Sequence, residues 1–471
     1  MCTILRVSHG ILVYIENFMN KKISLSIAIC LAAPSSAYAT NGYQLTGIGA
    51  YQKSLAGAVT AKPGSAMSAI SNPAGMARVG KRADFSLEMF MPERFVDLTA
   101  TGGEKNNSKS EQYGVPALGW TAPIDDGSDV YFGGGIYGTS GLGTDYPLTQ
   151  FTPEVDAVGP QQGPAIYFEG YSAIQFWQMA PTVAWHHNDK LTFGVSLNLD
   201  YQSVSFRQAF LMDGDNTTTP TADGIADDGT LVNFDLSRTA QAFGYGVSLG
   251  VLYDINDDLT IGATYKSKQE FSDLEYQLAH GDIADRHPAN FLQISGCGAE
   301  GNEVCPAGTY SLELDFPAMY SVGAAYQLNK FTSFSLDLKR IEWSKTLSAL
   351  TVTGPNGEVI TLPAGWDDQT IIAIGVEVAV NYKLKVRAGY NHAEAPFDEA
   401  SVDSNYILPA VTQSHYAFGA DYRINKYWEV GMHASKAADE ILTSTATSPM
   451  PTNAKIGLGI TTFGINLGYM F

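Results

Sequence analysis

The feature that most constrains this chain of 471 residues is the spacing of its apolar side chains. Along residues 191–201 every odd position is apolar or aromatic and every even position is small or polar, and residues 243–251 and 372–380 repeat the pattern. A period of two is that of a β-strand with one apolar face. After the N-terminus no apolar run approaches the roughly 20 residues that a membrane helix needs, which excludes a bundle of transmembrane helices.

Alternation also occurs in soluble β-sandwiches, so composition has to distinguish a soluble sandwich from a membrane β-barrel. Charged residues make up 16% of the chain, below the roughly 25% of ordinary soluble domains. Aromatic residues reach 11%, and there are 47 glycines. Dispersed apolar residues with little charge are typical of a membrane β-barrel. The net charge of −20 argues against a nucleic-acid partner, because phosphate binding needs clustered Lys and Arg.

The N-terminus predicts an exported protein. Two lysines precede the apolar stretch 23–33, which leads to an Ala-Tyr-Ala sequence at 37–39. A basic region, a short apolar core and an Ala-x-Ala site are typical of a secretory signal peptide. We expect residues 1–39 to be this peptide, with residues 1–18 as an upstream start extension. The alternative is a short buried helix.

Loss of the signal peptide leaves two cysteines, Cys297 and Cys305. In an oxidising compartment two cysteines this close, in a glycine-rich stretch, predict a disulfide-closed loop. A zinc site is the alternative, but no suitably spaced ligands accompany them. The Asp-rich stretch 213–229 does not complete a calcium loop with a terminal Glu. No metal and no cofactor are therefore predicted.

Short polar turns alternate with longer segments along the rest of the chain, which is the asymmetry of an outer-membrane barrel. The strands between them number fourteen over residues 83–471, and the first must pair with the last to close the sheet. The third is placed at 129–139, with a long loop over 140–170, and another strand is placed at 311–328. The predicted fold class is all-β, a 14-stranded antiparallel transmembrane β-barrel in the bacterial outer membrane.

Residues 40–82 differ from the barrel, because they are rich in Gly, Ala and Ser and lack sustained alternation. A segment of this kind predicts a small N-terminal hatch, or plug, inside the lumen. The inward positions of the strands are small, as at Gly194, Ser196 and Asn198. A closed soluble barrel would have large side chains there, so water, the hatch or a ligand must occupy the lumen.

Two features of the predicted wall suggest contacts with a solute. The inward cations Lys339, Lys385 and Arg387 either meet the carboxylate of a ligand or pair with inward Glu and Asp.

Three glycines, Gly133, Gly134 and Gly135, interrupt the third strand, and interior glycines often mark a bulge or kink. A kink here predicts a gap towards lipid; close packing against the hatch is the alternative, and both can hold.

With these features assembled, the sequence resembles the FadL/TodX family of outer-membrane transporters for hydrophobic compounds. The resemblance rests on residues 41–43 (Asn-Gly-Tyr), on residues 65–76 and on the aromatic C-terminal Phe471. The most specific stretch is Asn72, Pro73, Ala74 and Gly75.

The resemblance implies a hatch plugging a monomeric fourteen-stranded barrel, with Phe471 at the end that serves barrel assembly. It also implies that an apolar ligand is captured among the outer loops and leaves sideways beside the kinked third strand.

The function predicted is passive uptake of a hydrophobic small molecule, a long-chain fatty acid in the first hypothesis, with delivery into outer-membrane lipid. An aromatic or aliphatic hydrocarbon channel on the same fold is the alternative. An outer-membrane hydrolase would need a Ser–His pair, for which His415 and His433 are inward candidates, but no nucleophile motif accompanies them. A non-selective porin is the remaining alternative, and its lumen should carry more charge. The chain is therefore predicted not to be an enzyme.

Overall fold

The computed structural model describes residues 41–151, 154–156, 160–162, 166–212, 230–286, 291–297, 304–446 and 452–471. The predicted signal peptide 1–39 and the Asp-rich stretch 213–229 lie outside the described residues. None of the helices in the described ranges is long and apolar enough to cross a membrane.

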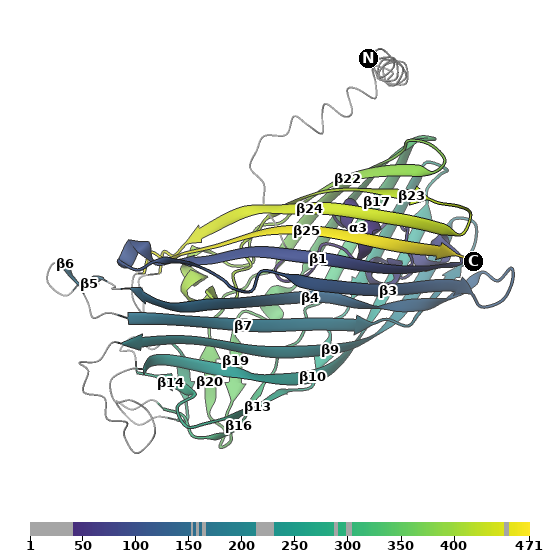
Figure 1. Ribbon diagram of the computed structural model, residues 1–471. Coiled ribbons are helices and arrows are strands. Elements are labelled where there is room, and N and C mark those ends of the chain that lie inside the picture. Colours follow the sequence, from purple (N-terminus) through teal and green to yellow (C-terminus); the bar gives the residue numbers. More distant parts are fainter. Residues whose placement is uncertain are drawn as a thin grey trace, which may run out of the picture. The chain divides into compact units, whose positions relative to one another are not determined.

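The described chain forms a closed barrel of fourteen antiparallel strands, as the sequence predicted (Figure 1). Neighbours along the wall pair in sequence, and β1 closes the ring by pairing with β25 from Arg82↔Met470 to Asp97↔Lys455. Closure removes the free sheet edges. The wall consists of β1 (Arg82–Asp97), β3 (Tyr113–Pro123), β4 (Val130–Phe151), β7 (Ile166–Met179) continued by β8 (Thr182–His186), β9 (Leu191–Met212), β10 (Thr230–Asp254), β11 (Leu259–Lys266), β17 (Met319–Asn329), β18 (Thr332–Ile341), β21 (Gln369–Ala379), β22 (Leu384–His392), β23 (Ser414–Arg423), β24 (Trp428–Thr443) and β25 (Lys455–Met470).

Two predicted boundaries are wrong. The third wall strand does not end at 139 but continues as β4 to Phe151, because its glycine-rich part pairs with β7 instead of forming a loop. The strand predicted at 311–328 is two strands, β16 (Gly308–Leu312) and β17. Pro317 lies between them, and proline cannot donate a hydrogen bond to a sheet.

The two ends of the barrel differ in the length of their connections. At one end lie tight turns such as 188–190, 256–258 and 381–383, together with the C-terminus; we call the adjoining part of the lumen the short-turn half. The other end carries long connections, and its part of the lumen is the long-loop half. In outer-membrane barrels the short turns are periplasmic and the long loops extracellular.

A second sheet of five strands lies at the long-loop end, because it is formed from the connections that follow β12 and β18 (Figure 1). Its order is β13 (Leu274–Leu278), β16, β19 (Leu350–Thr353), β20 (Val359–Leu362) and β15 (Gln293–Ser295). The remaining short elements are the helices α3 (Gly49–Ser54), α4 (Ser68–Ser71) and α5 (Gly75–Val79), the 3-10 turns η1 (Thr99–Thr101), η2 (Trp343–Lys345) and η3 (Glu399–Asn405), and the strands β2 (Lys105–Asn107), β5 (Glu154–Asp156), β6 (Pro160–Gln162), β12 (Glu270–Phe271) and β14 (Ile283–Asp285).

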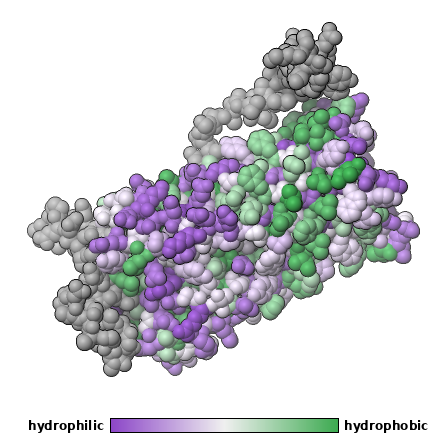
Figure 2. All heavy atoms as spheres, in the orientation of Figure 1, coloured by the Kyte–Doolittle hydropathy of each residue, from purple (hydrophilic) through white to green (hydrophobic). Residues whose placement is uncertain are grey.

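The alternation read from the sequence sorts side chains between the outside and the lumen. In β9, Val195 and Leu197 are 52% and 47% exposed, whereas the alternate residues Ser196 and Asn198 are buried. Figure 2 shows the apolar residues spread over the part of the wall towards the short turns, and hydrophilic residues gathered towards the long-loop end. The exposed apolar band is the surface that a barrel presents to lipid.

The interior is filled in two different ways. In the short-turn half many inward residues are small and others form ion pairs, and residues 46–81 with α3, α4 and α5 pack against them. In the long-loop half the same strands turn large apolar side chains inward, among them Val204, Phe206 and Phe234. The expectation of small inward residues along whole strands therefore holds only for the short-turn half.

Candidate functional site

The Asn-Pro-Ala-Gly stretch forms a turn held against β9 and β10. The side-chain amide of Asn72 donates to the carbonyls of Thr60 at 2.8 Å and Val251 at 3.2 Å, and its oxygen accepts from the Ala74 N–H at 3.1 Å. Glycines in the wall allow this close approach. A Cβ on Gly194 would overlap Pro73 and Ala74, and one on Gly250 would overlap Asn72 and Pro73. Small inward residues thus serve the close approach of this turn.

A single carboxylate fastens the middle of the same segment to β18. Asp337, fully buried, accepts hydrogen bonds at its Oδ2 from the N–H of Val59 at 3.0 Å, the N–H of Thr60 at 2.9 Å and the hydroxyl of Thr60 at 2.7 Å. Lys339 lies 3.5 Å from the same oxygen and donates to the Gly57 carbonyl. Lys339 is therefore engaged with the wall and the segment, and a contact with a ligand carboxylate stays a prediction.

The three consecutive glycines of β4 lie where the backbones of three strands come close together. A Cβ on Gly133, Gly134 or Gly135 would collide with a carbonyl oxygen of a neighbouring strand, and one on Gly133 would also meet Met76 of α5. The backbone φ of Gly134 is 134°, a value that residues other than glycine rarely adopt. Close packing against the N-terminal segment, one of the two expectations, is what the structure contains; the gap towards lipid stays a prediction.

The seam between β4 and its neighbour is interrupted at this level. β4 pairs with β7 from Ile136↔Met179 onwards and with β8 on the other side of the break, and the register continues unchanged. Across the break the Ala180 N–H donates to the Gly135 carbonyl at 2.9 Å. Pro181 has no N–H to donate. The seam is closed here but held by fewer hydrogen bonds than a regular ladder.

Buried apolar side chains connect the seam with the long-loop half. Ile48 and Met67 of the N-terminal segment form a cluster with Tyr137 and Ala180 on the inner side of the seam. Leu45 packs both against this cluster and against the large apolar cluster of the long-loop half. Packed apolar side chains therefore extend from the long-loop half to the inner side of the seam.

Tyr43 is the centre of the aromatic part of the long-loop cluster. Its ring lies 4.6 Å from that of Trp343, 5.5 Å from that of Phe176 and 5.7 Å from that of Trp366, centroid to centroid. Burial raises the pKa of Tyr43, and its hydroxyl has no hydrogen-bond partner among the described residues. An aromatic group of this size offers a large apolar contact surface with a polar atom at its edge.

Charges of the short-turn half are paired with one another. Arg387 donates to Glu377 at 2.6 Å and also to Asp421, and its guanidinium lies 4.4 Å from the centre of the Tyr51 ring. Lys385 is 3.4 Å from Glu377, and Lys62 of the N-terminal segment is 3.5 Å from it. Burial lowers the pKa of Lys62, and the carboxylate of Glu377 opposes this shift. Arg387 and Lys385 therefore have partners in the wall, as the second of the two sequence interpretations has it.

Four buried cations, Lys53, Arg82, Arg94 and Lys266, were not named in the sequence analysis. Arg94 of β1 is 4% exposed, and the hydrogen bond that the structure gives its side chain is to the Ser110 carbonyl at 3.0 Å. Its Nε has no partner, and no carboxylate lies within 4 Å among the described residues. The sequence signal was available, because Arg94 occupies an inward position of the alternating first strand.

The three remaining predicted residues are Cys297, Cys305 and Phe471. Cys297 and Cys305 form the predicted disulfide, in the connection that contains β15 at the long-loop end. Phe471 follows β25 at the opposite end, with its side chain 51% exposed and stacked on Tyr469. The N–H of Phe471 donates to the carbonyl of Lys81, at the end of the N-terminal segment, at 3.4 Å.

Comparison with known proteins decides what kind of protein this architecture serves. A model of the outer membrane protein transport proteins (OMPP1/FadL/TodX) matches residues 26–435. The chain belongs to this family. Family members transport hydrophobic compounds across the bacterial outer membrane, so the chain is an outer-membrane transporter of hydrophobic solutes and not an enzyme. The hydrolase hypothesis for His415 and His433 is thereby set aside.

Individual relatives agree with the family. The chain is 25% identical over 482 residues to the long-chain fatty acid transport protein of Escherichia coli O6:H1, covering 96% of this chain and 98% of that protein. It is 25% identical over 232 residues to a 47 kDa outer membrane protein of Pasteurella multocida and spans about half (51%) of that protein's length.

Solved structures show the same fold. The toluene transporter TodX of P. putida has a TM-score of 0.65 at 23% identity, with 91% of this chain and 99% of that chain covered. A FadL homologue of Pseudomonas aeruginosa has a TM-score of 0.67 at 16% identity, with coverages of 91% and 100%.

Proposed function

We propose that this chain takes up long-chain fatty acids passively, by capture among the long loops, displacement of residues 40–82 as a hatch, and lateral exit at the seam of β4 with β7 and β8. The observation that carries the proposal is the unbroken series of apolar side chains from the aromatic cluster around Tyr43, through Leu45, to Tyr137 at the seam. The full-length resemblance to a long-chain fatty acid transport protein supports the substrate class.

The lateral route follows from where an apolar solute is most stable. Moving an alkyl chain from water into hydrocarbon gains roughly 0.8 kcal/mol per CH₂, whereas a watery lumen offers nothing comparable. The short-turn half is blocked by the N-terminal segment and lined by paired charges, so straight passage would cross the least compatible part of the lumen. No energy source is needed as long as the solute is removed on the far side.

The hatch is fastened by polar contacts that can exchange. Asp337 holds Val59 and Thr60, Asn72 holds the turn, and Lys53 lies 3.0 Å from Glu88 of β1. A ligand that binds better to a displaced arrangement shifts the population towards it. Displacement of the Asn72 turn and of Met76 would expose the inner face of the seam.

A disulfide across the seam tests the lateral exit. Ile136 and Met179 are opposite each other in register, and both point outward. Paired side chains of neighbouring strands are close enough for a disulfide, so Ile136→Cys with Met179→Cys locks the seam without touching the glycines. We expect oxidised cells to lose uptake of labelled oleate and to regain it after reduction.

The matched control is Val322→Cys with Leu338→Cys, an outward pair between β17 and β18 away from the seam. It should transport equally well oxidised and reduced. Full uptake through the oxidised Ile136–Met179 pair would exclude the lateral exit. Surface binding of oleate, measured in the same cells, should be the same for both variants.

The second candidate substrate is an aromatic hydrocarbon, which the aromatic rings around Tyr43 favour. Competition separates the two substrates. If labelled oleate is displaced by other fatty acids but not by toluene, the chain is a fatty-acid transporter; if toluene displaces oleate at similar concentrations, the hydrocarbon assignment is correct.

A further inference from the structure

Five tight turns at the short-turn end share one backbone arrangement. In each of them the side-chain Oδ1 of an asparagine accepts hydrogen bonds of 2.8–3.1 Å from the N–H groups two and three residues later. The five asparagines are Asn188, Asn256, Asn329, Asn381 and Asn425. Because the side chain of asparagine determines a turn of this kind, the turn does not require a particular charge at the two residues that follow.

Charge nevertheless differs systematically from one turn to the next. The turns between β8 and β9 and between β10 and β11 have aspartate directly after the asparagine, and the turn between β3 and β4 is also rich in aspartate. These three turns follow one another around the ring. We call them the acidic arc, and their exposed carboxylates belong to Asp125, Asp126, Asp129, Asp189, Asp257 and Asp258.

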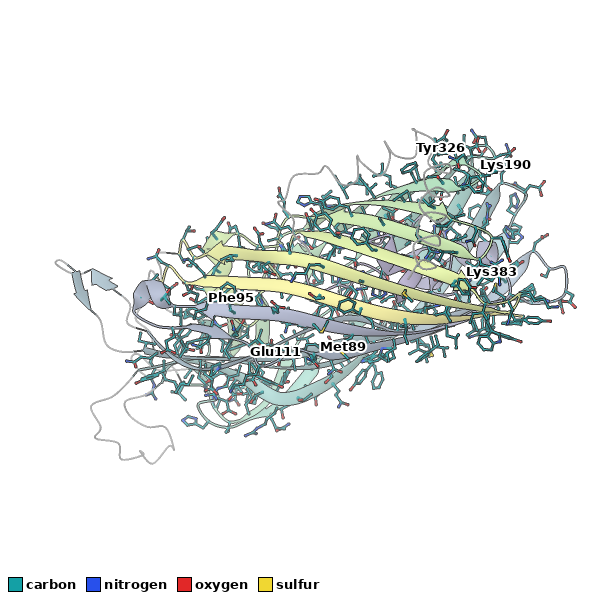
Figure 3. The ribbon with its side chains drawn as sticks, turned by 45° about the horizontal axis from the view of Figure 1, so that its top comes forward. Met89, Phe95, Glu111, Lys190, Tyr326 and Lys383 are labelled. Carbon is teal, nitrogen blue, oxygen red and sulfur yellow. A yellow bond between two sulfur atoms is a disulfide. The ribbon has the colours of Figure 1, made fainter. Side chains whose placement is uncertain are left out.

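The next three turns around the ring have the opposite charge. They connect β17 with β18, β21 with β22, and β23 with β24, and they contain Lys330, Lys383 and Lys426 without any Asp or Glu. We call these three lysines, with the aromatic residue next to each of them, the basic arc. Figure 3 labels Lys190 of the β8–β9 turn and Lys383 of the basic arc at the same end of the barrel, apart from each other.

Each lysine of the basic arc lies over an aromatic ring of its own turn. The Nζ atoms are 4.7–5.8 Å from the centres of the rings of Phe331, Tyr382 and Tyr427. None of the three ammonium groups has an ion pair within 4 Å among the described residues, whereas Lys81, near the acidic arc, is 2.7 Å from Asp126. The basic arc therefore presents three cations that the described part of the chain does not neutralise.

The basic arc lies at the edge of the lipid-facing surface. The residue before each asparagine of these turns is apolar and about half exposed, at 49% for Leu328, 50% for Val380 and 48% for Ile424. These side chains end the outward apolar band, so the lysines lie where hydrocarbon gives way to lipid head groups. Aromatic and basic residues are typical at that level of a membrane. Because the short turns are periplasmic, the leaflet concerned is the periplasmic one.

We infer that the basic arc binds the phosphate groups of anionic phospholipids in the periplasmic leaflet, and that the acidic arc disfavours the same lipids. A lysine ammonium attracts a phosphate as a point charge. A phospholipid fits these turns better than an acidic protein does, because each turn follows directly on a lipid-facing side chain. The turns on both sides of the seam between β4 and β8 belong to the acidic arc, so anionic lipid gathers away from that seam. The inference does not depend on which solute is transported.

Spin-labelled lipids measure this preference. Purified full-length protein is placed in phosphatidylcholine vesicles at low ionic strength, and the association of labelled phosphatidylglycerol is compared with that of labelled phosphatidylcholine. The net charge of −20 by itself would exclude the anionic lipid. We expect an enrichment of about twofold averaged over the whole barrel, since a lysine near an anionic head group contributes about fivefold and only part of the ring is basic. High salt should remove the enrichment.

Removal of the three lysines tests their role. Lys330→Gln combined with Lys383→Gln and Lys426→Gln should lower the association of phosphatidylglycerol to that of phosphatidylcholine or below it. Association of phosphatidylcholine itself should stay unchanged.

The matched control removes three exposed lysines of the long-loop end, by Lys105→Gln, Lys109→Gln and Lys345→Gln. It changes the net charge of the chain by the same amount. Because both ends of the barrel face the same lipid in these vesicles, the control should keep the enrichment only if the basic arc is its source.

A transfer of one lysine–aromatic pair tests whether the pair is sufficient. Asp257→Lys with Asp258→Phe copies Lys330 and Phe331 into the β10–β11 turn, which has the same asparagine bonds. This variant should associate with phosphatidylglycerol more strongly than the wild-type protein does.

Equal association of both labelled lipids with the wild-type protein would overturn the inference and leave an acidic periplasmic protein as the partner of the basic arc. Unchanged enrichment in the variant without the three lysines, or its loss in the long-loop control, would overturn it as well. Uptake of oleate is a separate measurement, so failure of the lipid preference leaves the proposed function in place.

Discussion

In the short-turn half of the lumen Arg387 bonds two carboxylates, whereas in the long-loop half Arg94 bonds one carbonyl. Both side chains are buried, both project inward from a wall strand, and both lie beside a tyrosine ring. The two arginines differ in their surroundings. Arg387 lies in the short-turn half, which the N-terminal segment fills, whereas Arg94 faces the apolar cluster of the long-loop half. The comparison shows that one wall stabilises two buried arginines differently, one with two carboxylates and one with a carbonyl and a tyrosine.

The largest effect is expected at Arg387. Replacing it by Met leaves Asp421 buried without its cation and Glu377 with Lys62 and Lys385 alone, and breaking a buried pair in this way costs about 3–5 kcal/mol. Unfolding in urea, followed in detergent, should show a loss of that size. Adding Glu377→Gln and Asp421→Asn to the variant should recover part of it; a triple variant as unstable as the single one would contradict the role assigned to charge pairing.

The second largest effect is expected in the contact between the hatch and β18. Asp337→Leu removes the acceptor of the N–H groups of Val59 and Thr60, and each unsatisfied buried donor costs about 1–3 kcal/mol. Hydrogen exchange at these two amides should accelerate, while exchange in β18 itself stays slow. A variant with an unbound hatch should also leak ions in a planar bilayer, and one that stays sealed with slow exchange would show that Asp337 is dispensable.

The smallest effect on stability is expected at Arg94, where a substitution should not lower the free energy of unfolding as it does at Arg387 and Asp337. Arg94→Met removes a buried charge that has no ion pair among the described residues, so the ligand-free protein should be as stable as the wild type or about 1 kcal/mol more stable. The same urea titration measures it beside Arg387→Met. A loss comparable with that of the Arg387 variant would mean that Arg94 has a structural role, and the contrast between the two halves would fail.

The fold was predictable because its main signal is local. Alternation along residues 191–201 fixed which side chains face lipid, and it did so independently of any contact elsewhere in the chain. The errors arose where a local signal was ambiguous. Residues 140–170 were placed in a long loop, but tertiary pairing with β7 makes the first part of them a strand, and Pro317 was not recognised as a break.

The site was predictable only in part. Asn72 and the glycines of β4 were identified, because turn and strand-breaking residues are visible in the sequence. Asp337 and Arg94 were not, because their importance depends on which groups surround them. Residues 277 positions apart in the chain, such as Thr60 and Asp337, meet only in the closed barrel.

The sequence by itself determined the class of molecule: strands with one apolar face, short turns opposed to long connections, and an N-terminal segment without alternation. Those properties follow from side-chain periodicity, which neighbouring residues carry. The tertiary structure alone decided which buried charges form ion pairs, because electrostatic compensation depends on distance in space, and the closed ring brings together groups from opposite ends of the chain.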